Sequence, residues 1–120
     1  MNGLVDSAGR ALLEVELKLE SGGDSSIIPV WIDTGFTGDL VLTSACVELL
    51  ELPLSGTVGA VLADGSEVAM KTYACSIQWF GKWQHLEVVE SVGEHSLLGV
   101  GLLLDHELRN DYRSGEITLD

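Results

Sequence analysis

The stretch W-I-D-T-G-F-T-G-D-L-V-L, residues 31–42, decides the fold because it places Asp33 and a glycine-containing loop between two apolar segments. Residues 27–32 are apolar apart from one proline, which predicts a strand that is covered on both faces and runs directly into Asp33. Residues 34–38 contain two glycines and two threonines and predict a tight loop, after which an apolar strand resumes at Leu40. The carboxylate of Asp33 is therefore expected at the end of a strand.

Strand and helix signals flank this loop. Within residues 11–20, ALLEVELKLE, apolar side chains alternate with charged ones from Leu13 onward, which predicts a half-buried strand. Residues 4–9 predict a short strand and a turn before it, so the amino terminus is expected to form a hairpin. After the loop, Ser44 is expected to cap a short helix that continues to Leu50.

Two further hairpins are predicted in the middle of the chain. Residues 57–63 and 66–73 flank Asp64-Gly65, a pair that readily adopts the positive φ angles of tight hairpin turns. This hairpin is expected to project from the body of the protein. Residues 74–80 and 83–89 are expected to pair in the same way across Gly81-Lys82.

The carboxyl-terminal third predicts a short helix over residues 102–108, a polar turn over 110–115 and a last strand over 116–119. Many short strands with one or two brief helices indicate a mostly β domain, either a small barrel or a sandwich. The 120 residues suit one core of ordinary size, so residues 1–120 are expected to form a single domain.

Charge excludes two classes of partner. Six Lys and Arg residues against nineteen Asp and Glu residues give a formal net charge of -13, which would repel phosphate backbones and anionic lipids. We therefore expect neither a nucleic-acid nor a membrane partner. The amino terminus has no positively charged start followed by an apolar run, and no apolar stretch approaches membrane-spanning length, so no export or anchoring signal is expected.

Cysteine and histidine usage predicts neither a disulfide framework nor a metal site. Cys46 and Cys75 are too few and too far apart for either, so buried free thiols in a reducing cytoplasm are expected. His85, His95 and His106 lack the close spacing of metal ligands, so no metal and no other cofactor is predicted.

The order of these features resembles the single-lobed, retropepsin-like aspartic peptidases, including small prokaryotic members. The resemblance rests on residues 31–42, the central hairpin, the L-L-G at residues 97–99 and the terminal strand. It implies a small closed β-barrel of the acid-protease type. It also implies a homodimer in which each chain donates one Asp33, and in which the two carboxylates activate a water to hydrolyse peptide or protein substrates.

The same resemblance implies roles for individual residues. Asp33 would be the catalytic carboxylate, Thr34 would hydrogen-bond across the two-fold axis, and Gly35 would allow close backbone approach. Substrate would contact the active-site loop and a flap at the central hairpin, through Thr37, Gly38, Ala63, Asp64 and Gly65. Leu97, Leu98 and Gly99 would pack behind the active-site loop. Residues 116–119 would join an interface sheet, because the family often pairs its chain termini there.

Departures from the viral members keep alternatives open. Val100 stands where those members carry an Arg, and Thr37 occupies the loop position of the Asp that this Arg pairs with. Phe36 follows the catalytic triplet where a small residue is common. One alternative is a retropepsin-like dimerisation or peptide-binding module with little or no turnover. Another is a monomer whose second carboxylate comes from a different protein.

Overall fold

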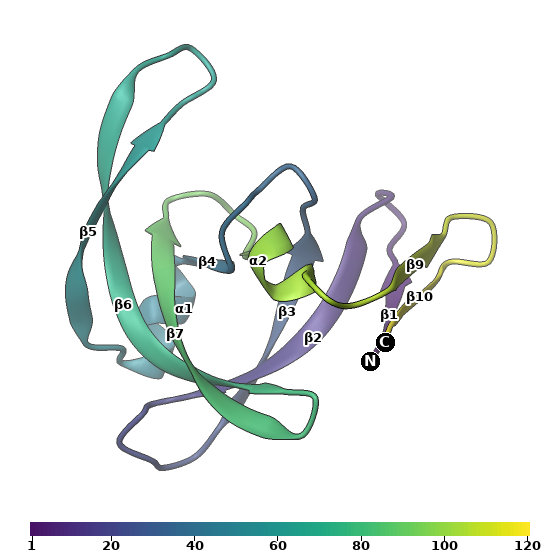
Figure 1. The fold of residues 1–120 in the computed structure, drawn as a ribbon, viewed down its shortest axis with the longest axis horizontal. Helices are drawn as coiled ribbons and strands as arrows, with labels where there is room; N and C mark the ends of the chain where they lie inside the picture. Colours follow the sequence, from purple (N-terminus) through teal and green to yellow (C-terminus); the bar gives the residue numbers. More distant parts are fainter.

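Six strands are joined into a ring in the computed structural model, which describes residues 1–120. The ring runs β6-β7-β4-β8-β3-β2 and closes where β2 pairs with β6 (Figure 1). The strands are β1 (Asn2–Val5), β2 (Ala11–Lys18), β3 (Ser26–Ile32), β4 (Leu40–Thr43), β5 (Leu54–Val61), β6 (Glu67–Trp79), β7 (Lys82–Ser91), β8 (Leu97–Leu98), β9 (Leu108–Asp111) and β10 (Glu116–Leu119). The predicted small β-barrel with short helices is confirmed.

Alternating side chains from the ring fill its interior. In β2, Leu13, Val15 and Leu17 are all at most 2% exposed, while the intervening residues are partly or fully exposed. The prediction that β3 is covered on both faces is wrong, because its side chains also alternate. Ile27 is 63% exposed and Trp31 is 36% exposed. The outer face of β3 therefore leaves apolar surface uncovered in the single chain.

The two helices are short and lie beside the ring. α1 spans Ser44–Leu50, as predicted, but its cap is Thr43, whose side chain accepts a hydrogen bond from the Cys46 N–H at 3.2 Å. α2 spans Val100–Leu103, so the helix predicted over residues 102–108 begins earlier and is shorter. The chain leaves it at Leu104, whose ψ of 139° is outside the helical region, and Asp105 follows with a φ of 67°. Neither helix is long and apolar enough to cross a membrane.

Both central hairpins form, with turns that differ from the predicted ones. At the β5-β6 tip only Gly65 has a positive φ, 85°, and the Leu62 N–H donates to the Ser66 carbonyl at 2.8 Å, so the loop is wider than a two-residue turn. The second turn is Phe80-Gly81, one residue earlier than predicted, with positive φ at both positions. β6 runs without interruption through both hairpins, whereas two separate strands were predicted.

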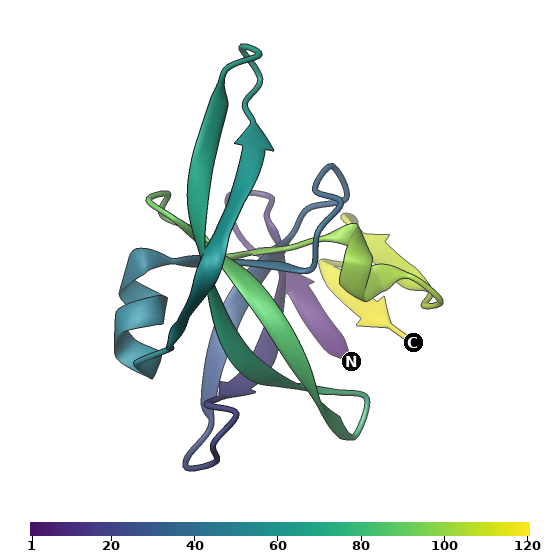
Figure 2. The same cartoon turned by 60° about the vertical axis from the view of Figure 1, so that its left-hand side comes forward.

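The carboxyl terminus contains a strand that the sequence did not predict. Leu108–Asp111 forms β9 where the prediction placed the end of a helix and a turn. β9 pairs with β10, and β10 pairs on its other side with β1. Figure 2 shows these strands gathered at one side of the barrel, with both termini among them. The last strand is therefore enclosed within its own chain.

Candidate active site

Asp33 lies directly after β3, in the loop over residues 33–39. Its backbone N–H donates to the Leu98 carbonyl at 2.8 Å, which extends the β3-β8 pairing to the acidic residue. Its Oδ1 accepts a hydrogen bond from the Gly35 N–H at 2.9 Å, and its carbonyl accepts one from the Phe36 N–H at 3.2 Å. The carboxylate is thus held by its own loop while Asp33 stays partly exposed and Thr34 is exposed.

The segment that follows β8 clamps this loop from behind. The N–H groups of Gly99, Val100 and Gly101 donate to the carbonyls of Asp39 (2.9 Å), Phe36 (2.7 Å) and Gly38 (3.0 Å), respectively. The contact is so close that a Cβ atom at Gly99 would lie 2.2 Å from the Gly38 carbonyl oxygen. Only glycine fits there, so the loop conformation depends on Gly99.

A hollow of about 340 Å³ opens beside Asp33. Trp31, Ile32, Asp33 and Leu97 line it, so its wall is apolar except for one carboxylate. Acid-base hydrolysis of a peptide bond needs a proton acceptor and a proton donor at the same carbonyl. One chain supplies one such group in this hollow.

The β5-β6 hairpin carries Ala63, Asp64 and Gly65 at its tip. In Figures 1 and 2 the hairpin and the β3-β4 loop project toward the same end of the molecule. Hydrogen bonds from the Ser66 hydroxyl (2.6 Å) and the Ser66 N–H (2.9 Å) hold the Asp64 carboxylate and lower its pKa. The hairpin also exposes apolar side chains, namely Val58 (43%), Val61 (71%), Leu62 (46%) and Val68 (36%).

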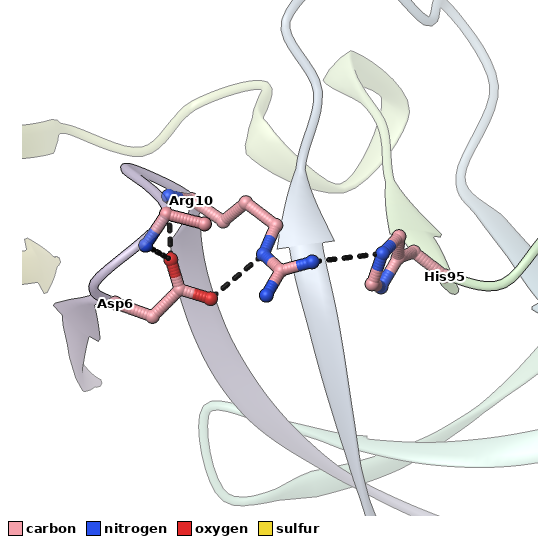
Figure 3. Close-up of polar contacts among 4 residues, drawn as sticks. Asp6, Arg10 and His95 are labelled. Carbon is pink, nitrogen blue, oxygen red and sulfur yellow. Dashed lines mark hydrogen bonds and ion pairs between the residues drawn. The ribbon is translucent and has the colours of Figure 1, made fainter.

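A polar cluster of Asp6, Arg10 and His95, which was not predicted from the sequence, lies next to the Asp33 hollow (Figure 3). The Arg10 Nε donates to the Asp6 Oδ2 at 2.7 Å, and its Nη1 lies 2.9 Å from the His95 Nε2. Because a guanidinium has no acceptor, the His95 Nε2 must accept this hydrogen bond. Hydrogen bonds from the Arg10 N–H and guanidinium and from the Ala8 N–H lower the pKa of Asp6.

Trp31 links this cluster to the Asp33 hollow. The indole contacts the His95 ring edge to face, with centroids 5.5 Å apart, and the Arg10 guanidinium lies 6.0 Å from its centroid. A second hollow of about 210 Å³, lined partly by Asp6, Arg10 and His95, shares Trp31 with the first. The only local signal was the Asp6-Arg10 spacing around a turn. The contact with His95 joins residues 85 positions apart, which no local pattern predicts.

The histidines do not gather with other ligands. No group of three or more His, Cys, Asp or Glu side chains is placed to hold a metal ion. His85 contacts Glu20, and His106 stacks on Phe80 with centroids 4.3 Å apart. Together with the contact between His95 and Arg10, each of the three histidines therefore contacts another side chain of the protein.

Comparisons with known proteins bear on the fold. No protein-family model matches the sequence, and no curated protein gives a significant match. A retropepsin-like aspartic protease from Rickettsia conorii matches the structure with a TM-score of 0.65 at 19% identity, covering 99% of this chain and 88% of that chain. The chain has the retropepsin-like fold. EIAV protease, complexed with the inhibitor HBY-793, matches with a TM-score of 0.64 at 20% identity, over 83% of this chain and 90% of that chain.

The retropepsin-like fold brings together two of the three segments that hold the predicted site residues. Residues 33–38 lie against residues 97–99 through the contacts of Gly99 and the hydrogen bond from Asp33 to Leu98. The hairpin tip at residues 63–65 is separate from them within the chain and projects on the same side (Figure 2). Residues 33–38 and 97–99 thus pack together, and the β5-β6 hairpin projects away from them.

Proposed function

We propose that the chain is one half of a homodimeric aspartic endopeptidase. The observation that carries the proposal is the single carboxylate of Asp33, held at a strand end in a hollow with an apolar wall. A second copy related by a two-fold axis would add the second carboxylate. The retropepsin-like fold supports this assignment, because one structural neighbour is named as an aspartic protease and another as a protease.

In the proposed reaction, a water bound between the two Asp33 carboxylates attacks the carbonyl carbon of the scissile peptide. One carboxylate accepts a proton from the water, and the other, which is protonated, donates to the carbonyl oxygen. The resulting tetrahedral intermediate collapses with proton transfer to the leaving amine, which breaks the C–N bond. Two carboxylates this close titrate as a coupled pair, so one proton is shared between them.

The surrounding residues position substrate and carboxylate. The Gly35 N–H holds the Oδ1 of Asp33, and Thr34 is exposed where a partner's loop would meet it. Thr37, Gly38 and the hairpin tip at residues 63–65 are the proposed substrate contacts. A hairpin that closes over an extended peptide excludes water and adds main-chain hydrogen bonds. Its exposed valines and leucine suit a peptide with apolar side chains.

Replacing the catalytic carboxylate tests this function. Asp33→Asn removes the proton acceptor with little change in shape, so cleavage of a peptide library by the dimer should disappear. Asp24→Asn, in the exposed β2-β3 loop, makes the same chemical change away from the site and should leave cleavage unchanged. If Asp33→Asn cleaved peptides as fast as the unaltered protein between mildly acidic and neutral pH, the proposal would be wrong.

A second candidate is a retropepsin-like dimerisation or peptide-binding module with little or no turnover. It is favoured by Val100 and Thr37, which cannot form the ion pair that ties the active-site loop to the interface in viral members. Peptide affinity without any product, measured on a confirmed dimer at high protein concentration, would select this candidate. For either function we propose a cytoplasmic location, supported by the two unpaired cysteines Cys46 and Cys75.

A further inference from the structure

The strands β1, β10 and β9 form a terminal part of the sheet, whose free edge is β9 and not the last strand of the chain, β10. The odd-numbered residues of β10 bond to β1, as shown by the Leu119 N–H to Met1 carbonyl at 2.8 Å. Its even-numbered residues face β9, as shown by the two 3.0 Å hydrogen bonds that Asp120 exchanges with Glu107. β10 therefore has no backbone groups left for a partner. The sheet order ends at β9, which pairs with β10 alone.

The ladder determines which backbone groups of β9 face outward. Residues of an antiparallel pair alternate between hydrogen-bonded and non-hydrogen-bonded positions. Because Glu107 bonds to Asp120, the register places Arg109 and Asp111 inward, toward β10. Leu108 and Asn110 then present their N–H and C=O groups to the free edge. An unpaired edge of this kind is a template for another strand.

We propose that β9 is the dimerisation edge and that two copies pair there antiparallel, centred on Asn110. This inference rests on the proposed function, which is incomplete without a second copy. In this register Asn110 faces the same residue of the partner, Leu108 faces Tyr112, and Arg109 faces Asp111. β9 follows α2, whose N–H groups clamp the Asp33 loop, so pairing at β9 is connected to the catalytic loop through one short segment.

Charge selects this register among those the ladder allows. Centring on Arg109 would set Arg109 against Arg109 and Glu107 against Asp111, which are like charges in directly opposite positions. Centring on Leu108 would set Asp111 against Asp105. Centring on Asn110 makes two Arg109-Asp111 pairs. Both side chains are exposed, by 72% and 45%, and their intrachain partners, Glu107 at 2.8 Å from Arg109 and Arg113 at 3.9 Å from Asp111, are exposed as well. Hydrogen bonds from the Arg113 and Ser114 N–H groups lower the pKa of Asp111, which keeps this carboxylate charged.

Asn110 adds an independent observation at the centre of the register. Its Oδ1 is buried and has no hydrogen-bond partner within the chain, while its Nδ2 donates to the Tyr112 hydroxyl at 3.1 Å. Buried polar atoms in proteins are nearly always paired. Because this oxygen is shielded within the single chain, the Asn110 amide would have to turn outward to accept a hydrogen bond from the Asn110 amide or Tyr112 hydroxyl of a second copy.

A charge-swap experiment tests the register. Arg109→Glu alone and Asp111→Lys alone each create two like-charge pairs, so each homodimer should weaken about tenfold or more at low salt. Mixing the two variants restores both opposite-charge pairs, so the mixture should form heterodimers with the affinity of the unaltered protein. Sedimentation velocity with one variant fluorescently labelled measures both affinities. Lys82→Glu, at the β6-β7 turn, controls for net charge and should not change dimerisation.

Two variants that differ in one backbone N–H group decide the outcome if Asp111→Lys does not fold. Asn110→Pro removes an outward N–H without touching the β9-β10 ladder and should abolish dimers, whereas Asn110→Ala retains the N–H and should dimerise. Unchanged dimers in Asn110→Pro or Arg109→Glu, or a mixture without heterodimer preference, would overturn the β9 interface. That result would leave the peptidase standing if Asp33→Asn is still inactive. The two proposals therefore fail separately.

Discussion

The backbone of Gly99 lies against Gly38 so closely that a Cβ atom at residue 99 would stand 2.2 Å from the Gly38 carbonyl oxygen. It would also stand 2.8 Å from the Phe36 carbonyl oxygen. Both neighbours are backbone atoms of the Asp33 loop and cannot move as a flexible side chain would. The position of the carboxylate is therefore coupled to a glycine 66 residues later in the chain.

Gly99→Ala should destabilise the protein by about 3 kcal/mol or more, because the overlap forces the active-site loop off its clamp. Urea unfolding followed by circular dichroism measures the change. Gly59→Ala is the matched control, since a Cβ there meets nothing within 4 Å and the midpoint should hardly move. Equal midpoints for both variants would contradict the clamp.

Replacing Val61 and Leu62 together by Ser should lower kcat/KM for apolar peptides about tenfold and leave the unfolding midpoint unchanged. These side chains are 71% and 46% exposed, so they contribute little to the core, and in the proposed function they would cover a bound peptide. A tenfold decrease in kcat/KM corresponds to losing roughly 1.4 kcal/mol from the burial of these side chains against the peptide. Replacing Ala45 and Leu49 together by Ser, at two exposed positions of α1, is the control and should leave kcat/KM unchanged. Equal kcat/KM in all three proteins would exclude the hairpin as a flap.

Truncation before Glu116 should unfold the chain rather than merely separate a dimer. The sequence-based expectation was a terminal strand at the interface, but β10 lies between β1 and β9. Ile117 and Leu119 are 1% and 0% exposed, and burying each contributes about 2 kcal/mol against a typical total of roughly 5–15 kcal/mol. Loss of a cooperative thermal transition is the expected result. A folded monomer would show that β10 is dispensable to the core.

Stability should fall between pH 9 and 11 because of Cys75. Burial raises the pKa of its thiol from 9.0 to about 11, and the residue is 0% exposed. In this window the unfolded state loses the proton while the folded state keeps it, so unfolding becomes more favourable as pH rises. About two pKa units correspond to roughly 2–3 kcal/mol. Urea unfolding at pH 8 and pH 10.5 should show this decrease, and Cys75→Ala should show a smaller one.

Local patterns were sufficient for most strands and for the position of Asp33. β2 alternates along its length, and the apolar run before Asp33 ends where β3 ends, since both signals lie within a few residues. The same patterns failed at β9, because Leu108-Arg109-Asn110-Asp111 has no apolar alternation. That strand exists because β10 offers it a ladder from residues that come later in the chain.

Residue order was therefore enough to predict an aspartic carboxylate at a strand end, a projecting hairpin and a mostly β domain, since each depends on neighbours in the chain. The closed barrel was implied by the family resemblance, because its closure joins β2 to β6 across distant parts of the chain. Three features needed the folded chain. These are the fit of Gly99 against Gly38, the contact of Arg10 with His95, and the enclosure of β10 that leaves β9 as the free edge. Each joins distant segments, and which backbone groups remain unpaired is known only after every ladder has formed.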